Sequence, residues 1–137
     1  MRRTLFSMVA AGLCAMGTSN GIKIHVVDGK SGKPVANEHV LVFYGDSAAD
    51  IRAQTHHQET HTDSAGNARL SGVKGFLEVW IDRHPLCEPS VRAFSVDAIQ
   101  SSGIVAPNTC GTATHVAVPA ELYLFVRKET FIEGMRH

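Results

Sequence analysis

Short runs of alternating apolar and polar residues, separated by glycine and proline, constrain this 137-residue chain more than any other feature. In the segment 22–28 the apolar residues alternate with Lys23 and His25, which is typical of a strand with one face buried and the other in water. A turn at 32–34 follows, since Pro fixes φ and Gly accepts a positive φ, and a strongly apolar strand is predicted at 39–44. Such patterning favours a core built by packing sheet on sheet.

Five further strands complete a predicted set of seven. They lie at 58–62, 67–71, 76–81, 91–99 (continued at 104–106) and 122–126. Between the first two of these, Asp63 can cap a turn and Gly66 can take the left-handed position, so a bulged hairpin is predicted there. No amphipathic helix is evident, and the set as a whole predicts an all-β sandwich.

Two further expectations concern the middle of the chain. The segment 45–56 is small and polar, and we interpret it as the long connection of a Greek key, with room for a one-turn helix at 48–53. Trp80 is predicted to be the core aromatic of the sandwich, with Phe76 on the same face.

The N-terminus is typical of an exported protein. Residues 1–17 combine Arg2 and Arg3 with an apolar run too short to span a bilayer, which predicts a signal peptide cleaved after Gly17. The pattern favours Sec export, and the twin arginines leave Tat export open. The mature chain, 18–137, is expected to form one domain. It keeps 11 basic and 13 acidic residues, a net charge of −2, so we expect no general affinity for nucleic acid or for a membrane surface.

Cysteine usage agrees with export. Cys14 leaves with the signal peptide, so the mature chain has two cysteines, Cys87 and Cys110. In an oxidising compartment they are expected to form a disulfide, which would stabilise the fold by about 3 kcal/mol through loop closure.

The first half of the chain resembles the carboxypeptidase regulatory-like and transthyretin-like (prealbumin-like) superfamily. The resemblance runs from about Ile22 to Asp82 and rests on the first strand leading into Gly32-Lys33-Pro34, on a second strand ending in Tyr44, and on Thr62-Asp63-x-x-Gly66. It implies an Ig-like or prealbumin-like Greek-key sandwich. For most such domains it also implies a non-catalytic module that supports, spaces or binds.

One enzymatic branch is an alternative. His25-Val26-Val27-Asp28 followed by Gly32-Lys33-Pro34 is similar to the opening of 5-hydroxyisourate hydrolases, and the resemblance implies that His25 would activate water. The chain departs from that family at its end, where Ile132 to His137 replaces the family's Tyr-Arg-Gly-Ser tail.

A second alternative is a metal site. If 58–62 is a strand, a period of two places His57, Glu59 and His61 on one face, the donor types that zinc and copper take. The competing interpretation of the same residues is the solvated face of an edge strand.

The sequence thus predicts a non-catalytic exported β-sandwich module for binding or structural support, without a cofactor. Its partner is expected to be an envelope protein or a surface ligand, bound through the loop 45–57 or an exposed sheet edge. The identity of the ligand, the oligomeric state, and periplasmic against extracellular location stay open.

Overall fold

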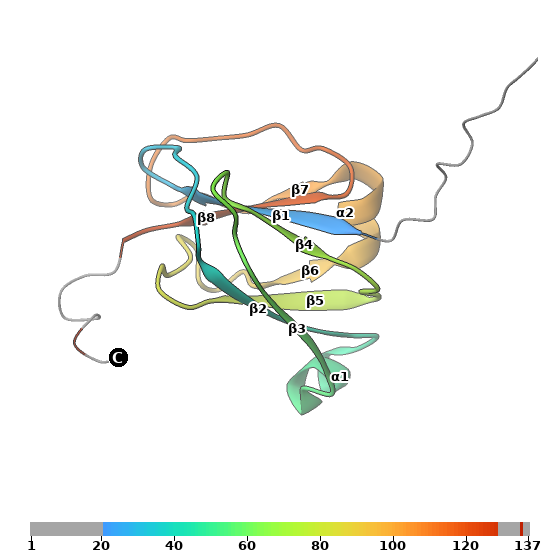
Figure 1. Ribbon diagram of the computed structural model, residues 1–137. Helices are drawn as coiled ribbons and strands as arrows, with labels where there is room; N and C mark the ends of the chain where they lie inside the picture. Colours follow the sequence, from blue (N-terminus) through green and yellow to red (C-terminus); the bar gives the residue numbers. More distant parts are fainter. Residues whose placement is uncertain (1–20, 129–134, 136–137) are drawn as a thin grey trace, which may run out of the picture.

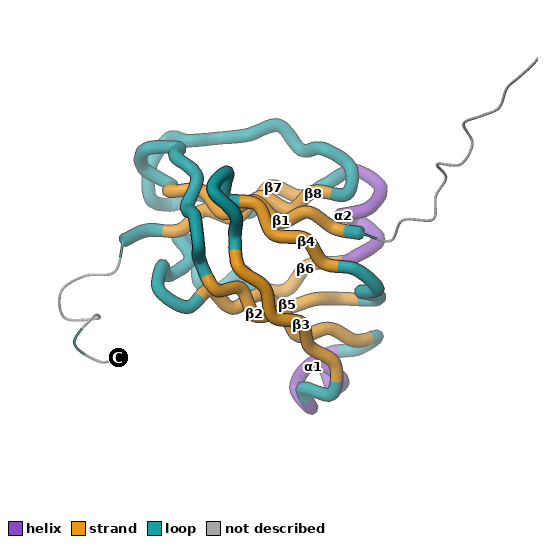
Figure 2. The backbone as a smooth tube through the Cα atoms, viewed as in Figure 1, coloured by secondary structure: helices purple, strands orange, loops and turns teal. Residues whose placement is uncertain are grey.

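Two four-stranded sheets pack face to face in the computed structural model, which describes residues 21–128 and 135 (Figures 1 and 2). The predicted signal peptide, 1–17, lies outside the described residues. The all-β sandwich is confirmed, although the described residues form eight strands where seven were predicted.

The first sheet is mixed. Its order is β4 (Asn67–Leu70), β1 (Ile22–Asp28), β8 (Glu121–Val126) and β7 (Ile104–Val105). Strand β1 runs antiparallel to β4 and parallel to β8, which in turn runs parallel to β7. Strands β1 and β8 therefore end on the same side of the molecule (Figure 1).

The second sheet is antiparallel throughout. Its order is β3 (His56–His61), β2 (His39–Gly45), β5 (Phe76–Ile81) and β6 (Ala93–Ser95). Alternate residues of β2 and β5 point inward, among them Val40, Val42, Leu77 and Val79, which are fully buried. They meet Ile24, Val26, Leu122 and Leu124 of the first sheet to form the core.

Two short helices lie in the connections. The helix α1 (Ala48–Ala53) is the one-turn helix that the sequence allowed, and Ser47 caps its N-terminus. The helix α2 (Val96–Ser102) corrects the prediction of one strand over 91–99: only β6 is extended there, and Ser95 then caps a helix that buries Val96 and Ile99 one turn apart. Neither described helix is long and apolar enough to cross a membrane.

The connections also differ from those predicted. The turn at 63–66 forms as expected, with Asp63 Oδ1 accepting from Ala65 N and Asn67 N and with Gly66 at φ +77°. It leads from β3 in one sheet to β4 in the other, however, so it is not a hairpin. The predicted Greek-key connection at 45–56 instead joins the neighbouring strands β2 and β3.

The assignment of Trp80 to the core is wrong. Because side chains alternate along β5, the inward positions of Leu77 and Val79 leave Phe76 and Trp80 on the outer face, where they are 46% and 43% exposed. The Arg92 guanidinium lies 4.3 Å from the centre of the Trp80 ring, and the indole nitrogen donates to Glu78. The aromatic ring is therefore held on the surface by two polar neighbours.

Candidate functional site

A disulfide joins two of the segments that meet at one end of the sandwich. Cys87 and Cys110 are bonded, as the sequence predicted, with their Cα atoms 5.5 Å apart. The bond ties the chain between β5 and β6 to the loop that follows β7. We call this the disulfide end; it comprises residues 28–36, 84–87, 109–110 and 127–128 and lies opposite α1 (Figure 1).

Asn108 organises the loop beside the disulfide. Its Nδ2 donates to the carbonyl oxygens of Gly29 and Ala113, and its Oδ1 accepts from Cys110 N. A side chain at Gly29 has no room, because its Cβ would lie 2.5 Å from Asn108 Oδ1 and 2.7 Å from Cys87 Sγ. Glycine at this position allows the disulfide and Asn108 to pack directly on the end of β1.

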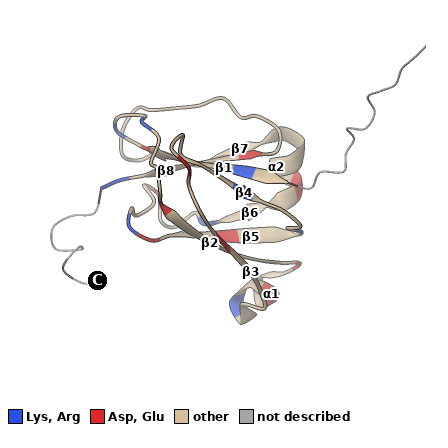
Figure 3. Ribbon diagram, in the orientation of Figure 1, with Lys and Arg blue, Asp and Glu red and all other residues tan. Residues whose placement is uncertain are grey.

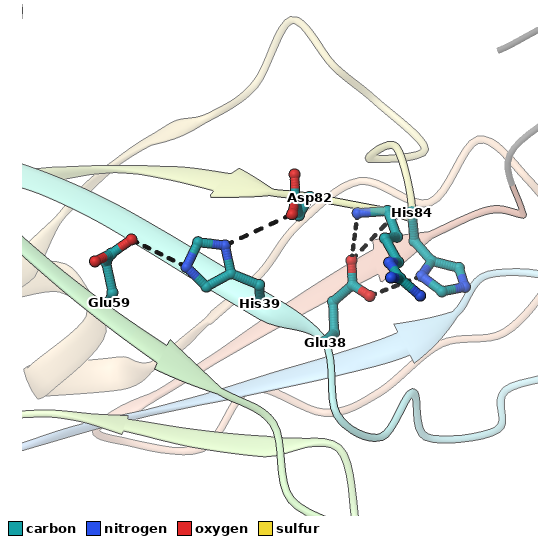
Figure 4. Close-up of polar contacts among 6 residues, drawn as sticks. Glu38, His39, Glu59, Asp82 and His84 are labelled. Atoms are coloured by element: carbon teal, nitrogen blue, oxygen red, sulfur yellow. Dashed lines mark hydrogen bonds and ion pairs between the residues drawn. The ribbon is translucent and has the colours of Figure 1, made fainter. Parts of the chain in front are cut away.

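A buried carboxylate fixes the next part of the site. Glu38 is only 2% exposed, and its Oε1 accepts from the backbone nitrogens of Arg83, at 2.7 Å, and His84, at 3.2 Å (Figure 4). Its Oε2 lies 2.9 Å from His84 Nδ1. Such a carboxylate needs partners inside the protein, and the segment 83–84 provides three hydrogen bonds. The imidazole of His84 is thereby held in one orientation.

The turn after β1 carries a second carboxylate. Asp28 Oδ1 accepts from the backbone nitrogens of Lys30 and Ser31, each at 2.8 Å. The hydrogen bond from Ser31 N is the main cause that lowers the pKa of Asp28, and the positive charge of Lys128 lowers it further, against the opposing effect of burial. The Asp28 carboxylate is thus engaged by its own turn.

These segments enclose an open groove of about 1130 Å³. Lys30 and Lys33 line it from the β1–β2 loop, Arg127 and Lys128 from the chain after β8, and His84 from the chain after β5. Among the described residues that line the groove, Asp28 is the one acid, so the lining carries an excess of three positive charges with His84 neutral. Figure 3 shows basic segments of the β1–β2 loop and of the chain after β8 at this same end. The groove is suited to a ligand that carries negative charge.

His25, the candidate water-activating residue, lies elsewhere. It is on the outer face of the first sheet, with Nε2 2.6 Å from Glu121 Oε1 and its ring stacked on Tyr123 at 4.1 Å. The ring of His115 stacks on the same Tyr123 at 3.7 Å. Burial, assisted by the charge of Glu121, raises the pKa of Tyr123. His25 is thus engaged by a carboxylate and an aromatic ring, and it does not line the groove.

The three residues of the metal alternative do lie on one face of β3, as the alternation predicted. Glu59 and His61 both contact His39, however, whereas His57 has a different neighbour. Glu59 Oε1 is 3.1 Å from His39 Nε2 (Figure 4). The ring of His61 lies near that of His39, and the ring of His57 lies near that of Phe43. Across residues 21–128, no group of three or more His, Cys, Asp or Glu side chains could hold a metal ion. The structure therefore does not support the metal alternative.

Sequence reasoning missed the groove. Its basic residues are far apart in the chain and belong to segments that it interpreted only as turns and ends. The loop 45–57, which was expected to bind unless an exposed sheet edge did, lies at the other end of the sandwich with α1 (Figure 1). The sequence did hold one signal for this site. Glu38 stands directly before the apolar strand predicted at 39–44, and a carboxylate buried there needs hydrogen-bonding partners.

Comparisons with known proteins give a similarity of structure only. No family model and no curated protein matches the chain. Among solved structures, it is similar to the full-length major pilin SpaD from Corynebacterium diphtheriae, at 14% identity and a TM-score of 0.48, over 81% of this chain and 32% of that one. It is also similar to BcpA, the major pilin subunit of Bacillus cereus, at 11% identity and a TM-score of 0.43, over 81% of this chain and 30% of that one. The chain spans about a third of the length of these pilins, and at this level of similarity neither bears on what it binds.

Proposed function

We propose that this protein is an exported, non-catalytic binding module, and that the groove at the disulfide end binds a ligand through its oxyanion groups, such as carboxylate, sulfate or phosphate. The observation that carries the proposal is the convergence of Lys30, Lys33, Arg127 and Lys128 on one groove. Lys and Arg are the side chains that proteins use against such groups.

The construction of the groove supports a binding role. Its walls come from four separated segments, held by the disulfide, by Asn108 and by Glu38. A site whose walls are fixed before the ligand arrives loses less conformational entropy on binding. The charge of Asp28 is engaged by backbone N–H groups, so it opposes an anion less than a free carboxylate would.

Export and a non-catalytic role have their own support. The signal-like segment 1–17 and the disulfide both fit an oxidising compartment. His25, on which the hydrolase alternative depends, is engaged by Glu121 and Tyr123, which favours a structural role for it. Membership of the carboxypeptidase regulatory-like and transthyretin-like superfamily is part of the same proposal. It is supported by the turns at Gly32 and Gly66, which form where its motifs lie.

Calorimetry with two probes tests the proposal. The mature chain is titrated with a sulfated heparin hexasaccharide and, separately, with a hexaglutamate peptide, each at low and at physiological salt. We expect at least one probe to bind, with an affinity that falls as salt rises, because the contacts are ionic and lie in an open groove. The probe that binds tells whether a glycan or a polypeptide presents the oxyanions.

Charge reversal then locates the site. The double variant Lys30→Glu/Lys33→Glu should lower the affinity by roughly tenfold or more, because like charges replace opposite ones in the groove. The matched control is Arg52→Glu/Lys74→Glu, which reverses two basic residues outside the groove and should leave the affinity nearly unchanged. Equal losses in both variants, or no binding of either probe, would overturn the proposal.

A further inference from the structure

His84 has a fixed pattern of hydrogen bonding. A carboxylate only accepts hydrogen bonds, so the 2.9 Å contact between Glu38 Oε2 and His84 Nδ1 requires the proton to be on Nδ1. Glu38 Oε1 is already occupied by two backbone N–H groups, which holds the carboxylate in place. The other ring nitrogen, Nε2, then carries a lone pair in the neutral imidazole and a proton in the imidazolium. It lies on the side of the ring away from Glu38 (Figure 4).

We infer that His84 is a pH-dependent oxyanion contact of the groove: when the imidazole is protonated, Nε2–H donates to the bound oxyanion while Nδ1–H stays bonded to Glu38. The inference rests on the proposed function and specifies how that site is regulated. It is carried by the position of His84 in the lining of the groove and by its 29% exposed side chain, against 2% for that of Glu38. Glu38 acts as a positioning residue, because it reaches the ligand only through the ring.

The charged groups around His84 come from three directions. Glu38 precedes β2 and contacts the ring directly. Asp28 ends β1, and Lys30 and Lys33 follow it in the β1–β2 loop. Arg127 and Lys128 follow β8. A bound oxyanion can accept a hydrogen bond from Nε2–H of the imidazolium but not from the lone pair of the neutral ring. Protonation of His84 and binding of an oxyanion therefore strengthen each other.

Two substitutions of His84 distinguish the role of Nδ1 from the role of Nε2. In His84→Asn the side-chain amide can replace Nδ1–H and keep the bond to Glu38, but nothing reaches the position of Nε2. In His84→Gln the amide can reach the position of Nε2 and donate at every pH. Both side chains keep a constant charge, so neither can titrate.

The experiment measures the affinity for the sulfated hexasaccharide at pH 8.0 and pH 5.5. The wild-type chain should bind about tenfold more tightly at pH 5.5, the size expected for one added charge-assisted hydrogen bond. His84→Asn should lose this increase. His84→Gln should show similar affinities at both pH values. Urea unfolding of each variant at both pH values checks that the fold is intact.

A third variant tests the role of Glu38. In Glu38→Gln the amide oxygen can accept from the two backbone N–H groups, and the amide nitrogen then donates to Nδ1. This places the proton of the neutral ring on Nε2, so the affinity at pH 8.0 should rise above that of the wild type. Nitrogen NMR shifts of the His84 ring report the change of tautomer without any ligand.

The outcomes distinguish this inference from the proposed function. If the His84→Asn variant binds more tightly at pH 5.5 to the same extent as the wild type, another group is responsible and the inference is overturned, while the proposed function stands. A neutral His84 with its proton on Nε2 in the wild-type chain would also overturn it. If the wild-type chain binds no probe at either pH, both fail.

Discussion

Asn108 Nδ2 donates to the carbonyl oxygen of Gly29 at 2.9 Å, joining the loop after β7 to the end of β1 across 79 positions of sequence. The same amide also donates to Ala113 O and accepts from Cys110 N, so both of its N–H groups and its oxygen are used. The disulfide also packs against Gly29, so this wall of the groove is close-packed only because residue 29 has no side chain.

Gly29→Ala should therefore be strongly destabilising. The added Cβ would lie within 2.9 Å of Asn108, Cys87 and Cys110, and separating these groups should lower the free energy of unfolding by about 2 kcal/mol or more. Gly72→Ala is the control, because that position has a positive φ but open space, so backbone strain alone should cost about 1 kcal/mol. Urea unfolding measures the loss of stability in each variant. Equal losses in Gly29→Ala and Gly72→Ala would show that the packing around Gly29 is not tight.

Removal of the disulfide should cost about 3 kcal/mol of stability through the larger entropy of the unfolded chain. The double variant Cys87→Ala/Cys110→Ala and the reduced wild-type chain should show similar losses in urea. Mass measurement after alkylation of the unreduced mature protein is the direct check. Two free thiols there would contradict the bond between Cys87 and Cys110.

Glu38→Ala should lower the free energy of unfolding by about 3 kcal/mol, because it leaves the partly buried N–H groups of Arg83 and His84 without their acceptor. Glu38→Gln should cost clearly less, since its amide oxygen can replace Oε1. Thermal and urea unfolding of the two variants measures the difference. Equal stability of the two variants would contradict this account, because Glu38→Gln keeps the acceptor and Glu38→Ala does not.

Asp28 should contribute stability that depends on pH. Its pKa in the folded chain is lowered below the ordinary value of 3.8, so its contribution is complete above that value and is lost as the pH falls through the folded pKa. Asp28→Asn should therefore be less stable than the wild type at pH 6, and the two should converge as the pH falls below the folded pKa of Asp28. Urea unfolding between pH 2.5 and 6 measures this, and a difference that grows as the pH falls would reverse the assigned sign.

Local sequence pattern was sufficient for most of the strands. Turns at Gly32 and Gly66 and the alternation in β1 and β2 are set by φ preferences and by the period of two, and both act within a few residues. The same alternation could not say which face of β5 is buried, because Phe76 and Trp80 are as apolar as Leu77 and Val79. The surface position of Trp80 depends on Arg92 and Glu78, and the cation–π partner comes from outside β5.

The site was less accessible to prediction. Pairing of the two cysteines followed from their number, but the groove depends on the crossing of the chain from sheet to sheet, which brings Lys33, His84 and Arg127 together. The sequence also contained a helix signal at α2, with Ser95 as an N-cap and Val96 and Ile99 at helical spacing. The alternation of apolar and polar residues before it led to the prediction of a strand instead.

Mapping the bound probe on the protein tests the central claim most directly. Backbone amide shifts of the mature chain are followed by NMR during titration with the sulfated hexasaccharide. We predict that the largest changes lie at the disulfide end, at Lys30, Lys33, His84 and Arg127, with little change in α1. Changes concentrated in α1 or on the outer face around Trp80, with the groove unaffected, would contradict the account.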